Sequence, residues 1–176
     1  MANHPSRRVK RVMAQGDLKL HLGCLDQPID GWINTDITMH IRVARIPFAA
    51  TALKRAGRIS PERFEQHKRG VFKKVDYLDV SKRFPFDDDS VSAVYSTHML
   101  EHLPLDIAAN FVQESFRVLK PGGVFRVGVP DLDLAIGTYD PSDPNPFVMK
   151  VFEAQQSMDK DRHSWMYNEV SLAAFL

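Results

Sequence analysis

The chain of 176 residues contains a single cysteine, Cys24, so it cannot build a disulfide framework within itself. Such cysteine usage is typical of a reducing compartment. The sequence also lacks a long hydrophobic run, because its longest apolar stretch, residues 46–53, is far too short to span a bilayer. The basic residues near the N-terminus are not followed by an apolar core, so they do not predict a secretory signal. We therefore expect a cytoplasmic protein with no membrane span.

An excess of charge of one sign is also missing. The 23 lysine and arginine residues nearly balance 22 acidic residues, which leaves a formal net charge of +1. No overall electrostatic field therefore indicates a nucleic acid or an anionic membrane as a partner. The hydrophobic fraction of 44% and the chain length predict one globular domain, residues 1–176, with a sizeable core.

Short apolar strands alternate with helical segments along the chain. We expect strands over residues 18–23, 32–37, 71–77, 91–96 and 124–129. We expect helices over residues 40–57 with a break at Pro47, from Pro61 with Ser60 as its N-cap, from about Asp106 to Lys120, and near residues 147–156 and 168–176. This alternation predicts an α/β fold with a mostly parallel sheet and helices on its faces.

Two residues stand where the first two predicted strands end. Gly23 follows the first strand, where it forms either a simple tight turn or a loop that lets a ligand approach the backbone closely. Asp36 ends the second strand, where its carboxylate either accepts hydrogen bonds from the diol of a ribose or caps the next helix. Ligands of open α/β sheets bind at the carboxyl ends of the strands, so the ligand interpretation places both residues in one site.

A third acidic residue, Asp79, follows the third predicted strand between Leu78 and Val80. A carboxylate beside apolar side chains suits an adenine ring, which stacks on its faces and donates from its exocyclic amine. The alternative is an aspartate that only stabilises a turn.

The segment after the fourth strand reads His98-Met-Leu-Glu101-His102, which is the H-x-x-E-H pattern of inverted zinc metalloproteases. On a helix the two histidines would share a face. The segment directly follows a strand, however, and Pro104 stands two residues beyond it, so a helix there would be short. A zinc hydrolase is therefore one alternative, a structural histidine at a helix start is another, and we assign no metal ligand.

Together these segments resemble class I S-adenosylmethionine (SAM)-dependent methyltransferases of the methyltransferase-11 (UbiE/COQ5-like) type. The resemblance covers roughly residues 18–133, and its segments occur in the order found in that family. The matching segments are Lys19–Cys24, Gly31–Ile37, Asp79-Val80, Phe84–Leu103 and Arg117–Asp131, of which Phe84–His102 and the Leu-Lys-Pro-Gly-Gly turn at 119–123 are the most specific.

The resemblance implies a Rossmann-like three-layer sandwich that uses SAM as cofactor and transfers its methyl group to a nucleophile. The implied acceptor is a small molecule or a glycan or lipid precursor, whose identity and whose oligomeric context the sequence does not define. The implied catalytic residue is His98, which lies in the segment that covers the methyl group and the acceptor. The implied cofactor-binding residues are His21, Gly23, Cys24, Asp36, Asp79, Val80 and Thr97.

Three departures from the family pattern shape further expectations. Leu25 stands where relatives usually have another glycine, so its side chain either crowds the cofactor or shifts the loop. The connection between the first two strands is too short for the usual crossover helix. The chain ends before the last two strands of relatives, one of them antiparallel, so we expect an incomplete C-terminal end. Leu25 and the C-terminal end together motivate one more alternative, a degenerate SAM-binding or scaffold domain without turnover.

Overall fold

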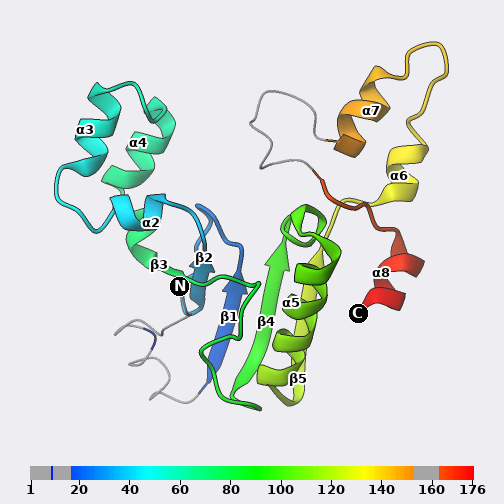
Figure 1. Cartoon of the computed structure of the whole chain (residues 1–176), viewed down its shortest axis with the longest axis horizontal. Helices are drawn as coiled ribbons and strands as arrows, with labels where there is room; N and C mark the ends of the chain where they lie inside the picture. Colours follow the sequence, from blue (N-terminus) through cyan, green and yellow to red (C-terminus); the bar gives the residue numbers. More distant parts are fainter. Residues whose placement is uncertain (1–8, 10–16, 153–162) are drawn as a thin grey trace.

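The computed structural model describes residue 9, residues 17–152 and residues 163–176. Its five strands form one sheet in the order β3-β2-β1-β4-β5, and every neighbouring pair is parallel. The strands are β1 (Leu18–Leu22), β2 (Ile33–Asp36), β3 (Val75–Tyr77), β4 (Val91–Thr97) and β5 (Leu119–Gly128). The predicted parallel α/β fold is thus confirmed, and the order reverses between β1 and β4 (Figure 1).

The helices lie in three groups around this sheet. One group rises beyond the carboxyl ends of β1 to β3, and a second lies beyond the ends of β4 and β5. Helix α5 packs beside the sheet, with the C-terminal helix near it (Figure 1). The helical elements are α2 (His40–Val43), α3 (Ala49–Arg55), α4 (Pro61–Lys68), the 3-10 helices η1 (Val71–Lys74) and η2 (Leu100–His102), α5 (Leu105–Val118), α6 (Leu132–Ile136), α7 (Asn145–Phe152) and α8 (Glu169–Phe175). None of the helices in the described ranges has the length and apolar character required to cross a membrane.

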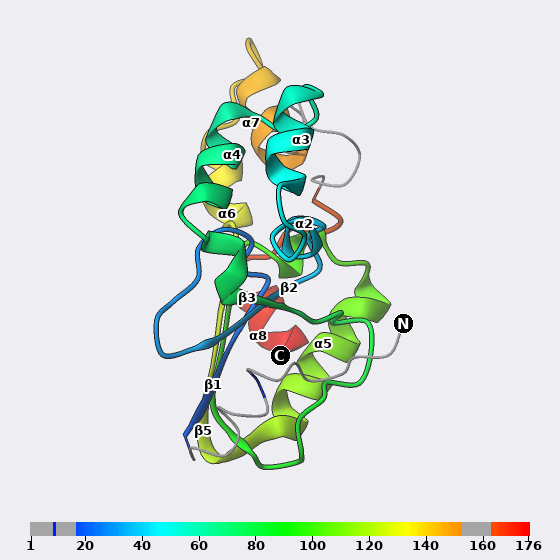
Figure 2. The same cartoon turned by 90° about the vertical axis from the view of Figure 1, so that its left-hand side faces the viewer.

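The core lies between α5 and one face of the sheet (Figure 2). Leu20 and Leu22 of β1 are fully buried, and alternation along a strand places them on the same face. Phe111 and Val118, which recur at helical spacing on α5, are fully buried in the same cluster. Since side chains alternate along β1, His21 points to the opposite face.

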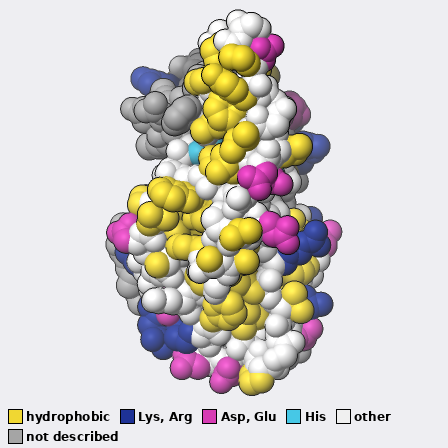
Figure 3. All heavy atoms as spheres, turned by 90° about the vertical axis from the view of Figure 1, so that its right-hand side faces the viewer, with side chains coloured by type: hydrophobic (Ala, Val, Ile, Leu, Met, Phe, Trp, Pro, Cys, Tyr) yellow, Lys and Arg dark blue, Asp and Glu magenta, His cyan; other side chains and the backbone are white. Residues whose placement is uncertain are grey.

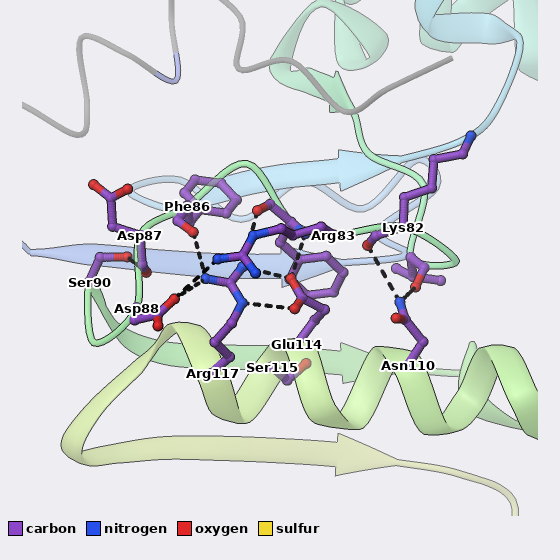
Figure 4. Close-up of polar contacts among 12 residues, drawn as sticks. Lys82, Arg83, Phe86, Asp87, Asp88, Ser90, Asn110, Glu114, Ser115 and Arg117 are labelled. Atoms are coloured by element: carbon purple, nitrogen blue, oxygen red, sulfur yellow. Dashed lines mark hydrogen bonds and ion pairs between the residues drawn. The ribbon is translucent and has the colours of Figure 1, made fainter.

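The polar side of α5 fastens the loop between β3 and β4 through Arg117 (Figure 4). Arg117 Nη2 donates to Phe84 O at 3.1 Å and to Glu114 Oε2 at 2.6 Å, and Nη1 donates to Phe86 O at 3.0 Å and Asp88 Oδ1 at 2.5 Å. Glu114 Oε2 also accepts the Phe84 N–H at 2.6 Å. The hydrogen bonds from Arg117 hold the pKa of Glu114 below its usual value, so this pair is charged at neutral pH.

Several predicted boundaries were wrong. Residues 71–74 form η1 rather than strand, because Gly70 turns the chain with a φ of +72° and accepts the Lys73 N–H. Strand β5 begins at Leu119 rather than Val124, since Leu119 already pairs with Val91 and the Lys-Pro-Gly-Gly segment forms an irregularity before the next pair, Ala93 with Val124. The expected helix over residues 40–57 is indeed broken, into α2 and α3, around Pro47. Helix α6 was not predicted.

Two other expectations concern the remaining ends and loops. The connection between β1 and β2, residues 23–32, contains no helix, as its length predicts. The helix expected near residues 147–156 is α7, which starts at Asn145, and the part of the expected range beyond Phe152 lies outside the described residues. The helix expected over residues 168–176 is confirmed as α8, with Asn168 as its N-cap.

The face that carries β5 and the C-terminal helices is rich in exposed apolar side chains (Figure 3). Within the described residues β5 pairs only with β4, so its outer edge has no strand beside it. Large exposed side chains on β5, α6, α7 and the loop between α6 and α7 are Val124, Leu134, Ile136, Tyr139 and Val148. An open edge beside apolar surface is the arrangement that natural sheets usually cover.

The Arg117 network predicts a large loss of stability in an Arg117→Met variant. The change leaves the Glu114 carboxylate and two loop carbonyls without their main donor, so we expect the free energy of unfolding to fall by about 2–4 kcal/mol. The measurement is chemical denaturation followed by circular dichroism. Arg83→Met is the matched control, because Arg83 contacts the same Asp88 at 3.5 Å from an exposed position and such pairs contribute under about 1 kcal/mol. Equal losses in both variants would contradict the assigned role of Arg117.

Candidate functional site

A cavity of about 180 Å³ lies where the carboxyl ends of β1 and β2 meet α5. It brings together four of the predicted cofactor residues, which come from three separate strand ends. The lining residues are Gly23, Asp36, Ile37, Leu78, Asp79, Val80, Ser81, Met99, Leu103 and Ile107. The site is therefore an apolar pocket with two carboxylates at its rim, next to the point where the strand order reverses.

The Asp36 carboxylate is held in place by two backbone N–H groups. Oδ2 accepts the Leu25 N–H at 2.9 Å, and Oδ1 accepts the Thr38 N–H at 2.7 Å. Each carboxylate oxygen has a second lone pair, so both can still accept a hydrogen bond from a ligand. This geometry suits a vicinal diol. The helix-cap alternative is not realised, because the N-cap of α2 is Met39 and no side chain caps this helix; Asp36 binds only the Thr38 N–H before it.

Gly23 lies directly beneath the side chain of Met99. A Cβ on Gly23 would lie 2.5 Å from Met99 Sδ, and its φ of +69° is in the left-handed region. Only glycine therefore fits here, and the group that approaches its backbone closely in this structure is the Met99 side chain. Pockets for cofactor-sized ligands measure about 300–1,000 Å³, so a ligand that covers Gly23 requires the flexible Met99 side chain to rotate away.

Leu25 does not crowd the cavity. Its side chain is 42% exposed and is not among the lining residues. Its φ is +44°, so the backbone keeps the left-handed conformation that a glycine would adopt more easily. The Leu25 N–H points to the Asp36 carboxylate. The loop thus forms without glycine at this position, at the cost of local backbone strain.

The Asp79 carboxylate lies at the rim of the cavity and has several donors. Oδ1 accepts from Ser81 N at 3.1 Å and Ser81 Oγ at 2.6 Å, and Oδ2 accepts from Lys82 Nζ at 2.6 Å. Partial burial raises the pKa of Asp79, but the hydrogen bonds from Lys82 and Ser81 lower it more, so its pKa is below the usual value. The neighbouring Val80 carbonyl accepts the Asn110 side-chain N–H at 2.7 Å, which ties this segment to α5 (Figure 4).

Two predicted cofactor residues point away from the cavity. His21 is buried, with Nδ1 3.2 Å from Asn34 Oδ1 and its ring 4.9 Å from the ring of Tyr95, and burial lowers its pKa. Cys24 is buried in a small cluster with Ile41, and its N–H donates to Thr35 O at 3.1 Å. Burial raises the pKa of the Cys24 thiol to about 12. In this structure both residues stabilise the sheet.

Thr97 is the last residue of β4 and His98 follows it, and neither residue lines the cavity. Thr97 packs on the backbone of Gly128, where a Cβ would lie 2.8 Å from Thr97 Cγ2. His98 has a φ of +51°, donates its N–H to Gly128 O at 3.0 Å and exposes 76% of its side chain. Its Nδ1 lies 3.4 Å from Glu101 Oε1. His98 is thus accessible from solvent and close to a carboxylate.

His98 and His102 do not share the face of an α-helix. β4 ends at Thr97, and residues 100–102 form only the 3-10 helix η2, so the platform that H-x-x-E-H zinc sites need does not form. Instead, His102 lies close to Glu101 and to the distant His163, and the ligand atoms of these three residues lie within 4.8 Å of one another.

The sequence analysis missed the apolar half of the cavity. Ile37, Met99 and Leu103 follow strand ends, and Ile107 is part of the helical pattern of α5. Their apolar character was the one feature of the sequence that could have indicated them, since apolar residues that follow strand ends lie at the edge of a parallel sheet where ligands bind. Which of them meet there depends on how α5 packs, and local sequence does not specify that packing.

Comparison with known proteins identifies the same family in a family model and in a relative. The family model described as a methyltransferase domain matches residues 20–127. A Mycolicibacterium smegmatis protein named as a probable S-adenosylmethionine-dependent methyltransferase is 41% identical over 66 residues, which are 37% of this chain. Those residues span only 25% of that protein.

Two solved structures share a distant likeness. One is described as a methyltransferase in complex with the Haloferax volcanii Trm112 methyltransferase activator, with 19% identity, a TM-score of 0.44, and coverage of 94% of this chain and 64% of that one. The other is described as a Zn-dependent alcohol dehydrogenase from Rhodobacter sphaeroides, with 14% identity, a TM-score of 0.40, and coverage of 99% and 79%.

Substitution of Gly23 and of Leu25, which lie two positions apart in one loop, should affect the free energy of unfolding to different extents. We expect Gly23→Ala to lower the free energy of unfolding by about 1–3 kcal/mol, because a Cβ is strained at this φ and collides with Met99. We expect Leu25→Gly to change it by less than about 1 kcal/mol, since relief of backbone strain offsets the greater freedom of the unfolded chain. Urea unfolding of both variants is the measurement. A larger loss for Leu25→Gly than for Gly23→Ala would refute this account of the loop.

Cys24 should be chemically silent in the folded protein. The raised pKa leaves almost no thiolate at pH 8, and the buried sulfur is out of reach of a reagent. We expect a chromogenic disulfide reagent to label one thiol per chain in guanidinium and none within minutes in native buffer. Because the chain has one cysteine, the readout is unambiguous. Rapid labelling of the native protein would show that Cys24 lines an open site instead.

Proposed function

This chain belongs to the methyltransferase domain family of SAM-dependent enzymes, and from that premise we propose that it binds SAM in the β1–β2–α5 cavity and transfers its methyl group to an acceptor. The observation that supports this proposal most directly is the convergence of Gly23, Asp36, Asp79 and Val80 on one cavity. These residues lie up to 57 positions apart, counted from Gly23 to Val80. Gly23 follows β1, Asp36 ends β2, and Asp79 and Val80 lie in the loop beyond β3.

The chemistry of the cavity fits the parts of SAM. The oriented Asp36 carboxylate offers two acceptors to the ribose hydroxyls. Leu78, Leu103 and Ile107 offer an apolar slot for a purine, with the ionised Asp79 at its rim as acceptor for an amine. The absence of a side chain at Gly23 leaves room for the amino-acid part once Met99 has moved.

Bound SAM supplies a methyl group already activated by its sulfonium charge. The protein's own task is then to align the acceptor and to keep water away. Met99 and Leu103 form an apolar cover over the cavity that suits the second task. Where the acceptor must lose a proton, we assign the base to His98: in its neutral form the exposed ring has one nitrogen lone pair to take that proton, and the Glu101 carboxylate lies nearby, with Oε1 3.4 Å from Nδ1.

The acceptor we propose is a small molecule or a glycan or lipid precursor. The balanced charge of the chain supports this class over a polyanion, because binding of nucleic acid draws on a basic surface. The alternative of a degenerate SAM-binding or scaffold domain without turnover is measurably different, since it predicts weak or absent binding of SAM and no methyl transfer to any acceptor.

The proposal predicts that the chain binds SAM and S-adenosylhomocysteine and that Asp36→Asn weakens both. Asparagine keeps the shape and one acceptor for the flanking N–H groups but removes the charge that strengthens hydrogen bonds to the ribose. That loss is worth about 1.5–3 kcal/mol, or about a 10- to 150-fold rise in Kd. Isothermal titration calorimetry measures it.

Asp87→Asn is the matched control, because Asp87 is an exposed aspartate in the turn before β4, outside the cavity. We expect its Kd to stay within about twofold of the unmodified chain. Circular dichroism of Asp36→Asn shows whether the loop still folds. An unchanged Kd in a folded Asp36→Asn variant would sink the ribose assignment, and the absence of any SAM binding by the unmodified chain would sink the proposed function.

A further inference from the structure

Glu101 is a carboxylate with no exposed surface. Neither of its oxygens receives a hydrogen bond from the described residues. The basic side chain nearest to it there is that of His98, whose Nδ1 lies 3.4 Å from Oε1 without hydrogen-bond geometry and whose ring is mostly exposed. A buried carboxylate without partners costs several kcal/mol, so this position calls for a cation or a proton.

Two imidazoles converge on this carboxylate. The ligand atoms of His102 and His163 lie within 4.8 Å of each other and of a Glu101 oxygen, and the two rings lie 5.0 Å apart at 61°. His163 Nδ1 lies 3.1 Å from Val151 O, so Nδ1 carries the proton and donates it to this carbonyl. That tautomer puts the lone pair on Nε2, and a backbone carbonyl on the other nitrogen is the usual support of a metal-binding histidine.

The backbone brings these groups together independently of any ion. Ser164 N and Trp165 N donate to Glu101 O at 2.6 Å and 3.1 Å. Ser164 Oγ donates to His102 O at 3.0 Å. The segment that carries His163 is thus fastened to the backbone of η2 at Glu101 and His102, so the convergence is part of the fold.

We propose that Glu101, His102 and His163 bind a divalent transition-metal ion of the zinc class. One carboxylate and two imidazoles are a common ligand set for zinc, with a further position left for water. At bond lengths of about 2.0–2.2 Å, tetrahedral ligand atoms lie about 3.3–3.6 Å apart, so separations within 4.8 Å need a contraction of at most about 1.5 Å. The set is richer in nitrogen than magnesium or calcium sites, which use oxygen ligands.

The position of the ion suggests what it does. η2 follows Met99, which covers Gly23, and His98, which comes directly after β4. An ion at Glu101 would join this loop to residues 163–176, whose Tyr167 is buried in the core with no hydrogen-bond partner for its hydroxyl in the described part of the chain. The ion would therefore stabilise the loop that covers the cofactor cavity and would position it. It is not assigned a step in methyl transfer.

The test is titration of the full chain, stripped with EDTA, with Zn²⁺ and Co²⁺ in the absence of SAM. We expect one equivalent to bind with a Kd in the micromolar range or below, to raise the melting temperature, and to give the visible absorption of four-coordinate Co²⁺. Mg²⁺ at the same concentration should not raise the melting temperature. Because no cofactor is present, this result is independent of whether the proposed function holds.

Two variants locate the site. His163→Ala should raise the Zn²⁺ Kd about 100-fold or more, since loss of a ligand exceeds the effect of losing its support. Glu101→Gln should lose the ion as well, yet its metal-free form should melt at or above the temperature of the unmodified metal-free chain, because the buried charge is gone. A carboxylate with only a structural role would not combine loss of zinc binding with an equal or higher melting temperature of the metal-free form.

His40→Ala is the matched control, because His40 belongs to another histidine pair, with Nδ1 3.0 Å from His67 Nε2. We expect this variant to keep the unmodified Zn²⁺ affinity. Absence of zinc binding by the unmodified chain would overturn the proposal. So would binding that survives unchanged in both Glu101→Gln and His163→Ala, or binding that His40→Ala abolishes.

Discussion

The parallel direction of all five strands is the constraint on which the rest of this structure depends. Because the strands are parallel, their carboxyl ends meet at one edge, and the residues that follow them gather there whatever their separation in sequence. Helix α5 turns that edge into a site by two means. Its apolar side covers the sheet and reaches the cavity with Ile107, while its polar side holds the loop that carries Asp79, through Asn110 and Arg117.

Parallel strands also need long connections, and the one between β1 and β2 is too short to include a helix. Buried polar groups stabilise this connection instead. Asn34 Oδ1 accepts the Ile29 N–H at 2.8 Å, and its Nδ2 donates to Ile29 O and Trp32 O at 2.9 Å and 3.1 Å. His21 contacts the same Asn34 oxygen from β1. His21, which was predicted to bind the cofactor, thus helps to stabilise the β1–β2 connection in the place of a crossover helix.

The predicted cofactor residues that line the cavity are those whose position follows from local pattern. Gly23 follows β1, Asp36 ends β2 and Asp79 lies just beyond β3, and strand ends can be recognised from alternation and turn residues. His21 does not line the cavity, since the same alternation, with Leu20 buried toward α5, puts it on the other face. Met99 over Gly23, by contrast, is a contact between segments 76 positions apart, and only the packing of the whole sheet defines it.

Unfavourable features of the structure gather at the edge where the site lies. Among the described residues four that are not glycine have a positive φ, and two of them, Leu25 and His98, lie beyond β1 and β4 there. Glu101, whose carboxylate has no hydrogen-bond partner in the same part of the chain, lies three residues beyond His98. Strained backbone and buried charge persist where surrounding structure holds them and where they serve binding. One short loop, residues 98–102, contacts both positions: Met99 lies over Gly23, and Glu101 is the proposed ligand of the cation. A ligand over Gly23 and a cation at Glu101 would therefore offset these costs through the same loop. Occupancy of either position should therefore change the mobility of Met99 between them.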